Sequence, residues 1–268
     1  MANLRDLRLH MRAIRQTLQV TNAMYLISTA KLRKGRRILS DTEPYFTRIQ
    51  KAMYDIISGT SMERSKFLTA SGKDDSSYTA IVVITSDKGL AGGYNANVYR
   101  MVNQLCARVK NPVLILIGAI GFRYFSHSQW TILENFSFQS RLPDAHDAAE
   151  ISEYILAQFL WGMFSEVHII YTHMYSSIKL VPRELQLLPL SKEKMQEEFE
   201  KNGKRRRDVN FEYWPSKNSV FEHLVPMYVK GIVYGSLIEA HVSEQSARRS
   251  AMDEASKNAE LMLNDLQL

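Results

Sequence analysis

The sequence predicts an α/β fold in which two long terminal helices pair as an antiparallel coiled coil around a central Rossmann-like α/β domain. Core-type residues recur at both ends of the chain with alternating three- and four-residue spacing, as in a helix that packs along another helix. Between them, short β-branched runs alternate with helical patterns, which is typical of a sheet covered by helices. We therefore expect an N-terminal coiled-coil helix over residues 1–58, an α/β domain over residues 78–210 and a C-terminal coiled-coil helix over residues 219–268.

The N-terminal helix carries the first of two seams, by which we mean a row of core-type positions along the side of a helix that faces its partner. Its core-type positions are Leu4, Leu7, Met11, Ile14, Leu18, Thr21, Tyr25, Ser28 and Leu32. The pattern resumes at Leu39 and continues to Ile56, so we expect one helix that ends near Ser58 and is roughly 80 Å long at 1.5 Å per residue. Pro44 lies inside this helix and is expected to kink it, because proline lacks a backbone donor. Residues 59–77 are polar and rich in turn formers, which marks a boundary.

Short apolar runs flanked by turn residues mark the strands of the middle part. We expect strands at Thr79–Thr85, Pro112–Ile117 and Glu166–Tyr171, a weaker one at Ser177–Val181, and helices near Asn95–Val109 and Ala145–Phe159. The first two strands are almost entirely apolar, as strands buried on both faces are. Residues 182–210 are expected to form a connector, which contains the basic run Lys204–Arg207.

The last helix is expected to begin at Ser219 and to run to the end of the chain. Its seam positions are Met227, Gly231, Tyr234, Ile238, His241, Gln245, Arg248, Met252, Ala255, Ala259, Met262 and Leu266. This alternation of four and three matches the first helix, so the two helices are predicted to be mutual partners.

Composition excludes several classes of protein. With 45% apolar and 23% charged residues, the chain is core-forming rather than disordered. Its longest apolar runs are too short to cross a bilayer, and no apolar signal region follows Met1. Cys106 is the only cysteine, which excludes an internal disulfide and cysteine-rich zinc sites; we expect it to be a small buried apolar residue.

Positive charge is concentrated in the first helix. Residues 1–39 carry nine Lys or Arg against one Asp, a net charge of +8, whereas the whole chain is only +6. A nucleic-acid-binding coiled coil is one interpretation of this charge and of the basic run in the connector. Against it, the basic residues alternate with an apolar seam and no aromatic stacking platform accompanies them, so we expect no nucleic-acid partner.

Both seams contain polar positions where a coiled coil usually has leucine or isoleucine. They are Thr21, Tyr25 and Ser28 in the first helix and His241, Gln245 and Arg248 in the last. Such residues either fix the register or meet a third partner. We favour a partner outside the pair, because so many polar groups are costly when buried between two helices. In particular, we expect the Glu244–Arg248 pair to be exposed and the guanidinium to reach another chain.

We recognise no catalytic, cofactor-binding or metal-binding motif in the sequence. The segment Thr85–Asn95 follows a strand and precedes a helix, as phosphate-binding loops do, but its glycines match neither GxxxxGK[ST] nor GxGxxG. A tight turn with positive φ is the better interpretation. The seven histidines lack metal-ligand spacing. Besides a nucleic-acid-binding coiled coil, the other functional alternative is a small-molecule enzyme built on the α/β domain.

Three segments resemble the gamma subunit of F-type ATP synthases, the central rotor shaft. Residues 14–34, IRQTLQVTNAMYLISTAKLRK, are similar to I-x-x-T-x-x-I-T-x-A-M-x-x-V-A-x-x-K-x-R. Residues 84–95, ITSDKGLAGGYN, are similar to I-T-S-D-R-G-L-C-G-G-x-N, and residues 243–259, SEQSARRSAMDEASKNA, to S-E-x-A-A-R-M-x-A-M-x-x-A-T-x-N-A. The three motifs occur in the family's order, and the resemblance extends over essentially the whole chain.

This resemblance implies a rotor without bond chemistry of its own. The basic coiled coil would lie in the central hole of a ring of three alpha and three beta subunits and meet an acidic loop of each beta subunit in turn. The α/β domain would rest on the membrane c-ring and the epsilon subunit, at the cytoplasmic face of a bacterial cell membrane. The residues expected at or near the rotor–stator contact are Met24, Lys31, Arg33, Glu244, Gln245 and Arg248.

The chain also departs from the family's pattern. Ala91 replaces the usual cysteine, Gln16 replaces the usual asparagine, and residues 25–28 are an unusual version of their segment. The regulatory cysteine pair of plant members is absent, so we expect no thiol switch. Family members usually continue for some helical turns beyond the position of Leu268, so we expect either a truncated sequence or a short rotor tip.

Overall fold

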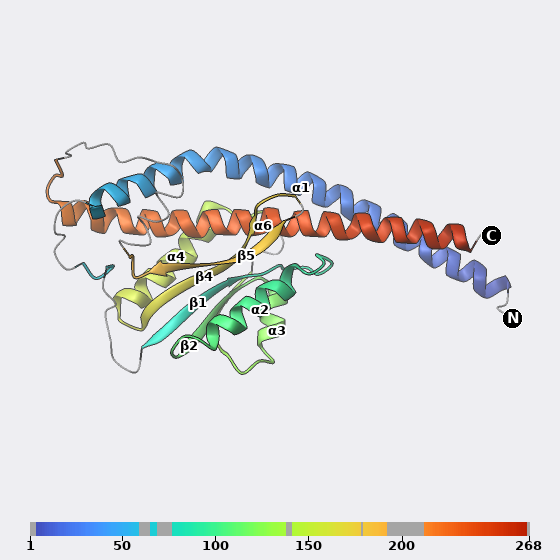
Figure 1. The fold of residues 1–268 in the computed structure, drawn as a ribbon, viewed down its shortest axis with the longest axis horizontal. Coiled ribbons are helices and arrows are strands. Elements are labelled where there is room, and N and C mark those ends of the chain that lie inside the picture. Colours follow the sequence, from blue (N-terminus) through green and yellow to red (C-terminus); the bar gives the residue numbers. More distant parts are fainter. Residues whose placement is uncertain are drawn as a thin grey trace.

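Two long antiparallel helices lie along one side of a layered α/β domain and extend beyond it (Figure 1). The computed structural model describes residues 4–58, 65–68, 77–137, 141–177, 179–191 and 212–266. The long helices are α1 (Leu4–Ser58) and α6 (Lys217–Asp265). Between them come β1 (Tyr78–Ile84), α2 (Tyr94–Cys106), β2 (Pro112–Ile117), α3 (Ala119–Phe125), β3 (Thr131–Phe136), α4 (Ala145–Leu160), β4 (Phe164–Met174) and β5 (Leu180–Leu188). The predicted fold class is confirmed.

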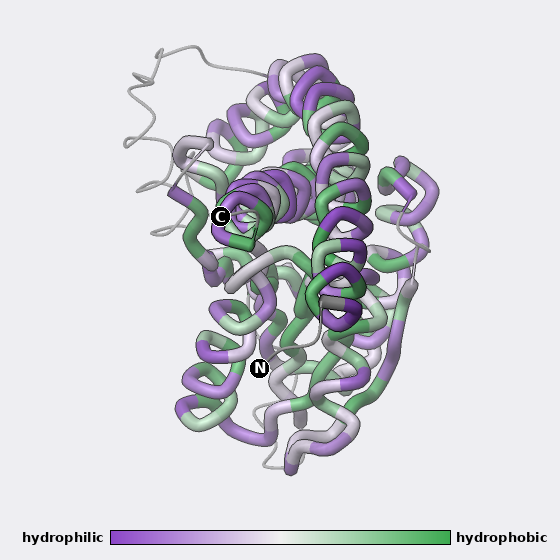
Figure 2. The backbone as a smooth tube through the Cα atoms, turned by 90° about the vertical axis from the view of Figure 1, so that its right-hand side faces the viewer, coloured by the Kyte–Doolittle hydropathy of each residue, from purple (hydrophilic) through white to green (hydrophobic). Residues whose placement is uncertain are grey.

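The sheet has the strand order β3-β2-β1-β4-β5, with β5 alone antiparallel. Alternate residues of each strand point to opposite faces. Val82 and Ile84 of β1 therefore join the core under α4 and α6, whereas Ile81 and Val83 join the core under α2 and α3. In Figure 2 this domain lies below the two long helices. Cys106 is buried in the core under α2 and α3, as expected.

The two edge strands differ from the sequence prediction. The run Thr131–Phe136, which was not predicted, forms β3 at one edge; its residues are half-buried or exposed and include the polar Glu134 and Asn135. The weak strand predicted at Ser177–Val181 exists but with other bounds, since β5 begins at Leu180 and extends through Pro182 into the expected connector. An edge strand tolerates proline because one side of its backbone needs no partner.

The paired part of α1 and α6, which we call the shaft, uses the predicted seam. From Leu7 to Leu32, every predicted seam position of α1 is buried or half-buried. Ile14 packs against Ala259 and Leu263, and Leu32 packs against Ile238 and Val242 of α6. α1 runs unbroken through Pro44 and curves along its length (Figure 1).

A polar pair explains one interruption of the seam. The Thr21 and Ser256 hydroxyl oxygens lie 2.7 Å apart across the shaft, both buried. The two hydroxyls share one hydrogen bond, and the Thr21 hydroxyl also donates to the Leu18 carbonyl at 3.1 Å, so burial of the pair costs little and the pair fixes the register of the two helices. Thr21 thus meets α6 itself rather than a third partner.

Two predicted seam positions of α6 are wrong. Met227 and Met262 are more than half exposed, while Tyr228 and Leu263 beside them are buried. A straight helix drifts by about 20° per heptad relative to a strict seven-residue repeat. Near the C-terminal end of α6 the buried position has therefore advanced by one residue, from Met262 to Leu263. At the other end, α6 packs on the α/β domain rather than on α1 alone.

Cysteines replacing Thr21 and Ser256 are expected to form a disulfide within one chain under mild oxidation, because their side-chain oxygens already touch. Non-reducing electrophoresis of the purified chain measures this. Val20→Cys with Ser256→Cys is the matched control, since Val20 is 57% exposed on the outside of the shaft. Crosslinks that form only between chains, or equally in the control, would contradict this pairing of α1 with α6.

Within the described residues, no helix is both long enough and apolar enough to cross a membrane.

Candidate functional site at the junction of shaft and domain

The loop of residues 85–93, which follows β1, lies against α6 where the shaft meets the domain. Its backbone has positive φ at Leu90 (62°) and at Gly92 (56°). The predicted tight turn is therefore confirmed at Gly92, and Leu90 adopts the same left-handed region without being glycine.

The domain holds both ends of this loop by hydrogen bonds. Asp87 Oδ1 accepts from the Ala119 backbone N–H at 3.0 Å and from the Ser137 hydroxyl at 3.2 Å. At the other end, Asn95 Oδ1 accepts from the Ser86 N–H at 3.1 Å, and the Asn95 amide donates to the Ser86 hydroxyl at 2.7 Å. The loop is therefore a fixed part of the domain.

Arg248 of α6 holds the middle of the loop. Its Nη2 donates to the carbonyl oxygens of Lys88 at 2.7 Å and Gly89 at 3.1 Å, and its Nε donates to Gly89 at 3.2 Å. Its Nη1 donates to Glu244 Oε1 at 2.5 Å. The prediction of an exposed Glu244–Arg248 pair is wrong: the two side chains are 12% and 7% exposed. The loop, which sequence spacing could not place there, supplies the carbonyls that make burial of the guanidinium tolerable.

A group of charges surrounds this pair. Burial raises the pKa of Glu244, while the neighbouring Arg248 and Lys31 oppose that rise. Burial, with Lys31 and Arg248 nearby, lowers the pKa of His241 to about 4. His241 is therefore neutral near pH 7. The structure thus brings together three of the predicted contact residues, Lys31, Glu244 and Arg248.

The remaining predicted contact residues lie along the shaft. Met24 is half-buried beside the seam and Arg33 is exposed on α1. Gln245 is only 3% exposed, and its amide donates to Glu244 Oε1 at 3.4 Å. Met24 and Arg33 can therefore meet another chain directly, whereas Gln245 lies inside this one.

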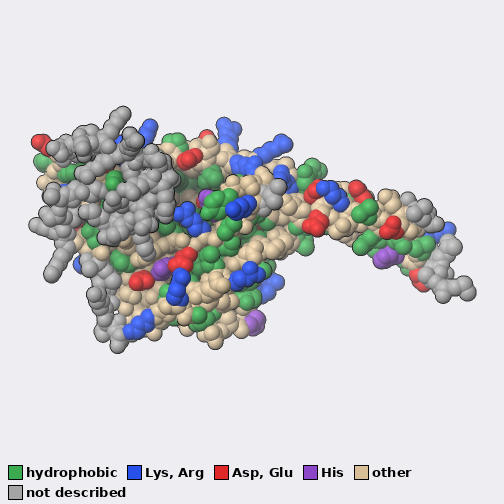
Figure 3. Space-filling model, viewed as in Figure 1, with side chains coloured by type: hydrophobic (Ala, Val, Ile, Leu, Met, Phe, Trp, Pro, Cys, Tyr) green, Lys and Arg blue, Asp and Glu red, His purple; other side chains and the backbone are tan. Residues whose placement is uncertain are grey.

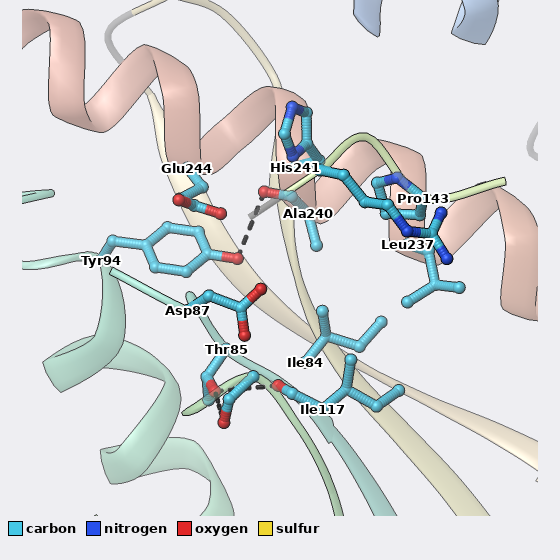
Figure 4. A pocket seen from close by; sticks show the side chains of 12 residues that line it. Ile84, Thr85, Asp87, Tyr94, Ile117, Pro143, Leu237, Ala240, His241 and Glu244 are labelled. Carbon is cyan, nitrogen blue, oxygen red and sulfur yellow. Dashed lines mark hydrogen bonds between the residues drawn. The ribbon is translucent and has the colours of Figure 1, made fainter. Parts of the chain in front are cut away.

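A small cavity opens at the carboxyl ends of β1 and β2, beside the loop (Figure 4). Its volume is about 30 Å³, which admits one or two water molecules but not a nucleotide. Tyr94 closes one side and donates from its hydroxyl to the Ala240 carbonyl at 3.2 Å, as the dashed line in Figure 4 shows. The groups that face the cavity include Asp87, His241 and Glu244.

Further hydrogen bonds join the shaft to the sheet. The Ser243 hydroxyl donates to the Thr172 carbonyl at 2.8 Å, and the Ser246 hydroxyl donates to the Ser177 carbonyl at 3.2 Å. From α1, Arg36 donates to the Ser177 hydroxyl at 3.0 Å. Sequence patterning missed Ser243 and Ser246, because small polar residues on a helix carry no signal for the backbone carbonyls that they meet. These contacts make shaft and domain one mechanical unit.

Comparisons with known proteins identify this arrangement. A family model described as ATP synthase matches residues 3–268. The ATP synthase gamma chain of Acetivibrio thermocellus is 38% identical, and the match covers 100% of this chain and 92% of that protein. The chain belongs to the ATP synthase gamma chain family. Another member, from Ruminiclostridium cellulolyticum, is 37% identical over 99% of this chain and 90% of its own length.

Solved structures share the fold at low sequence identity. The rotor of the Euglena gracilis mitochondrial ATP synthase matches with a TM-score of 0.65 and 16% identity, over 98% of this chain and 94% of that chain. The central stalk and c-ring structure from Tetrahymena thermophila matches with a TM-score of 0.63 and 22% identity, over 88% and 99%. As a gamma chain, the protein is a central rotor subunit of the ATP synthase and a non-catalytic part of its stalk.

Proposed function

We propose that the free end of the shaft turns inside a ring of alpha and beta catalytic subunits and that the α/β domain is driven by the membrane c-ring. The observation that carries this proposal is the shape of the chain: the shaft projects beyond the domain as two helices, and both termini lie at its far end (Figure 1). Rotation of such an asymmetric body presents a different face to each catalytic site. Differential contact of this kind biases each site between conformations of unequal nucleotide affinity.

The outer surface of α1 supports contact with a surrounding ring. A second row of residues at three- and four-residue spacing lies on this helix, away from α6. Its members are Leu9, Ala13, Gln16, Val20, Ala23, Ile27 and Ala30, all exposed. Apolar side chains in such a continuous row are typical of a surface that meets a protein partner. The row therefore supports a stator that touches α1 from outside.

The charge of the same helix supports an acidic stator. Arg33, Lys34 and Arg37 are exposed on α1, and Figure 3 shows Lys and Arg side chains gathered along the upper edge of the molecule. Basic groups on a rotor complement acidic loops on the ring and steer assembly. We propose that Met24 and Arg33 touch these loops directly. Lys31, Glu244, Gln245 and Arg248 would then support the contact surface from behind.

The opposite end of the molecule is proposed to meet the c-ring and the epsilon subunit, at the cytoplasmic face of a bacterial cell membrane. Trp161, at the end of α4, is 79% exposed, and Trp214, just before α6, is 90% exposed. Both elements end or begin away from the chain termini (Figure 1). Exposed tryptophan is enriched at protein interfaces, which supports partners at this end.

Reversing two charges, Arg33→Glu with Lys34→Glu, is expected to weaken assembly with alpha and beta subunits. Arg36 is left unchanged, because it donates to Ser177 within the chain. The loss should be larger at about 0.01 M than at about 0.15 M salt, since the Debye length falls from roughly 30 Å to 8 Å. Analytical ultracentrifugation of the reconstituted complex measures this.

The matched control is Arg100→Glu with Arg123→Glu, an equal charge change on exposed positions of α2 and α3. It should assemble as the unmodified chain does with alpha and beta subunits. If both double variants assemble equally, and without regard to salt, the basic surface of α1 is not a stator contact.

A further inference from the structure

We propose that Arg248 is a positioning residue: it affects coupling by fixing the loop of residues 88–92 to the shaft, without touching the surrounding ring itself. The proposal rests on the rotor function proposed above and assigns a distinct role to one residue within it.

The geometry of the guanidinium supports this role. Three of its hydrogen bonds reach the Lys88 and Gly89 carbonyls, and a fourth reaches Glu244. Arg248 is 6% exposed, so it presents almost no surface to another chain. A guanidinium offers five donors in a planar fork, which suits two adjacent carbonyls and a carboxylate at once. Its donors are thus directed into the chain.

The loop, in contrast, is exposed. Lys88, Gly89 and Leu90 all face solvent, and the Leu90 side chain is 62% exposed. Leu90 has a φ of 62°, which a leucine adopts only when its surroundings impose it. The carbonyls held by Arg248 directly precede this residue. Arg248 therefore acts on the orientation of the one large apolar side chain that the loop presents outward.

A second contact between loop and shaft allows the role to be tested. A Cβ atom added at Gly92 would lie 3.8 Å from the Ala251 Cβ on α6. The mean Cβ–Cβ separation in disulfides is about 3.8 Å, so Gly92→Cys with Ala251→Cys can tie the loop to the shaft covalently. The φ of 56° at Gly92 strains a cysteine there, and this strain is common to the two-cysteine variant and the combined variant that are compared below. Cys106 is buried and does not compete for this bond.

The experiment compares the assembled complex with four versions of this chain: unmodified, Gly92→Cys/Ala251→Cys, Glu244→Gln/Arg248→Ala, and the combination of all four changes. Glu244→Gln is included so that no buried carboxylate loses its partner. ATP hydrolysis and ATP-driven ion translocation are measured with and without diamide oxidation. Each combined variant is compared with the two-cysteine variant in the same redox state, which removes the effect of the cysteines themselves.

Without the disulfide, loss of the guanidinium is expected to reduce ion translocation per ATP roughly 2- to 30-fold, the range typical of coupling residues that touch neither ligand. With the disulfide, the combined variant should recover the translocation of the oxidised two-cysteine variant. Loss that persists after complete oxidation would show that Arg248 or Glu244 acts by its own contact, and so would overturn the proposal. Unaltered translocation in the reduced combined variant would also overturn it. Failure of the rotor function itself is distinguishable, because the unmodified chain would then not support translocation.

Discussion

Replacing Gly118 by alanine is expected to destabilise the free chain by about 3 kcal/mol or more, because its conformation and its surroundings both reject a side chain. Gly118 has a φ of 105° and directly follows β2. An added Cβ would lie 2.8 Å from the Thr85 carbonyl carbon and closer still to its oxygen. Since these are backbone atoms, the start of the 85–93 loop would have to shift.

Urea unfolding followed by circular dichroism measures this loss. Gly89→Ala is the matched control: an added Cβ there has nothing within 4 Å, and its carbonyl remains available to Arg248. The control should change the free energy of unfolding by less than about 1 kcal/mol. Equal midpoints for the two variants would mean that the close approach of β1 and β2 at Gly118 does not constrain the fold.

Arg248→Ala is expected to destabilise the free chain by about 3–5 kcal/mol, since it leaves the Glu244 carboxylate buried without its cation. The two carbonyls of the loop lose their donor in the same variant. This expectation reverses the one that follows from sequence alone, where an exposed pair at this spacing is worth only about 0.3–0.5 kcal/mol. Denaturant unfolding of the isolated chain separates the two values.

The double variant Glu244→Gln/Arg248→Ala is compared with the single variant Arg248→Ala in the same unfolding experiment. Removing the charge of Glu244 should restore about half or more of the lost stability, because the unpaired carboxylate is the largest part of the cost. If the single variant is as stable as the unmodified chain, or the double variant is less stable than the single one, the pair does not carry the energy assigned to it.

The fold was predictable where periodic burial dominates. The seam of α1 and the buried strands β1 and β2 follow directly from their apolar spacing. β3 and β5 were not predictable in this way, since edge strands are half-buried and their polar residues obscure the alternation. The register of α6 was predicted to within one residue, because a strict heptad repeat does not follow the drift of a straight helix.

The surroundings of Glu244 and Arg248 were only partly predictable from the sequence. Sequence spacing placed Glu244 and Arg248 on one face of a helix, and the resemblance assigned them to a partner contact. Their actual partners, the Lys88 and Gly89 carbonyls, lie about 160 positions earlier in the chain, and backbone carbonyls have no sequence signature. Only the fold brings the loop after β1 onto α6.

The unequal support along α6 has a consequence for how the protein deforms under load. From Leu237 to Arg248 the helix is tied to the domain and its 85–93 loop, whereas near its end the described contacts include the packing of Ala259 and Leu263 on Ile14 and the hydrogen bond between Ser256 and Thr21. A torque applied at the domain therefore meets a stiff section first and a thin two-helix section beyond it. The thin section has the lower torsional stiffness, so twist accumulates there as elastic strain.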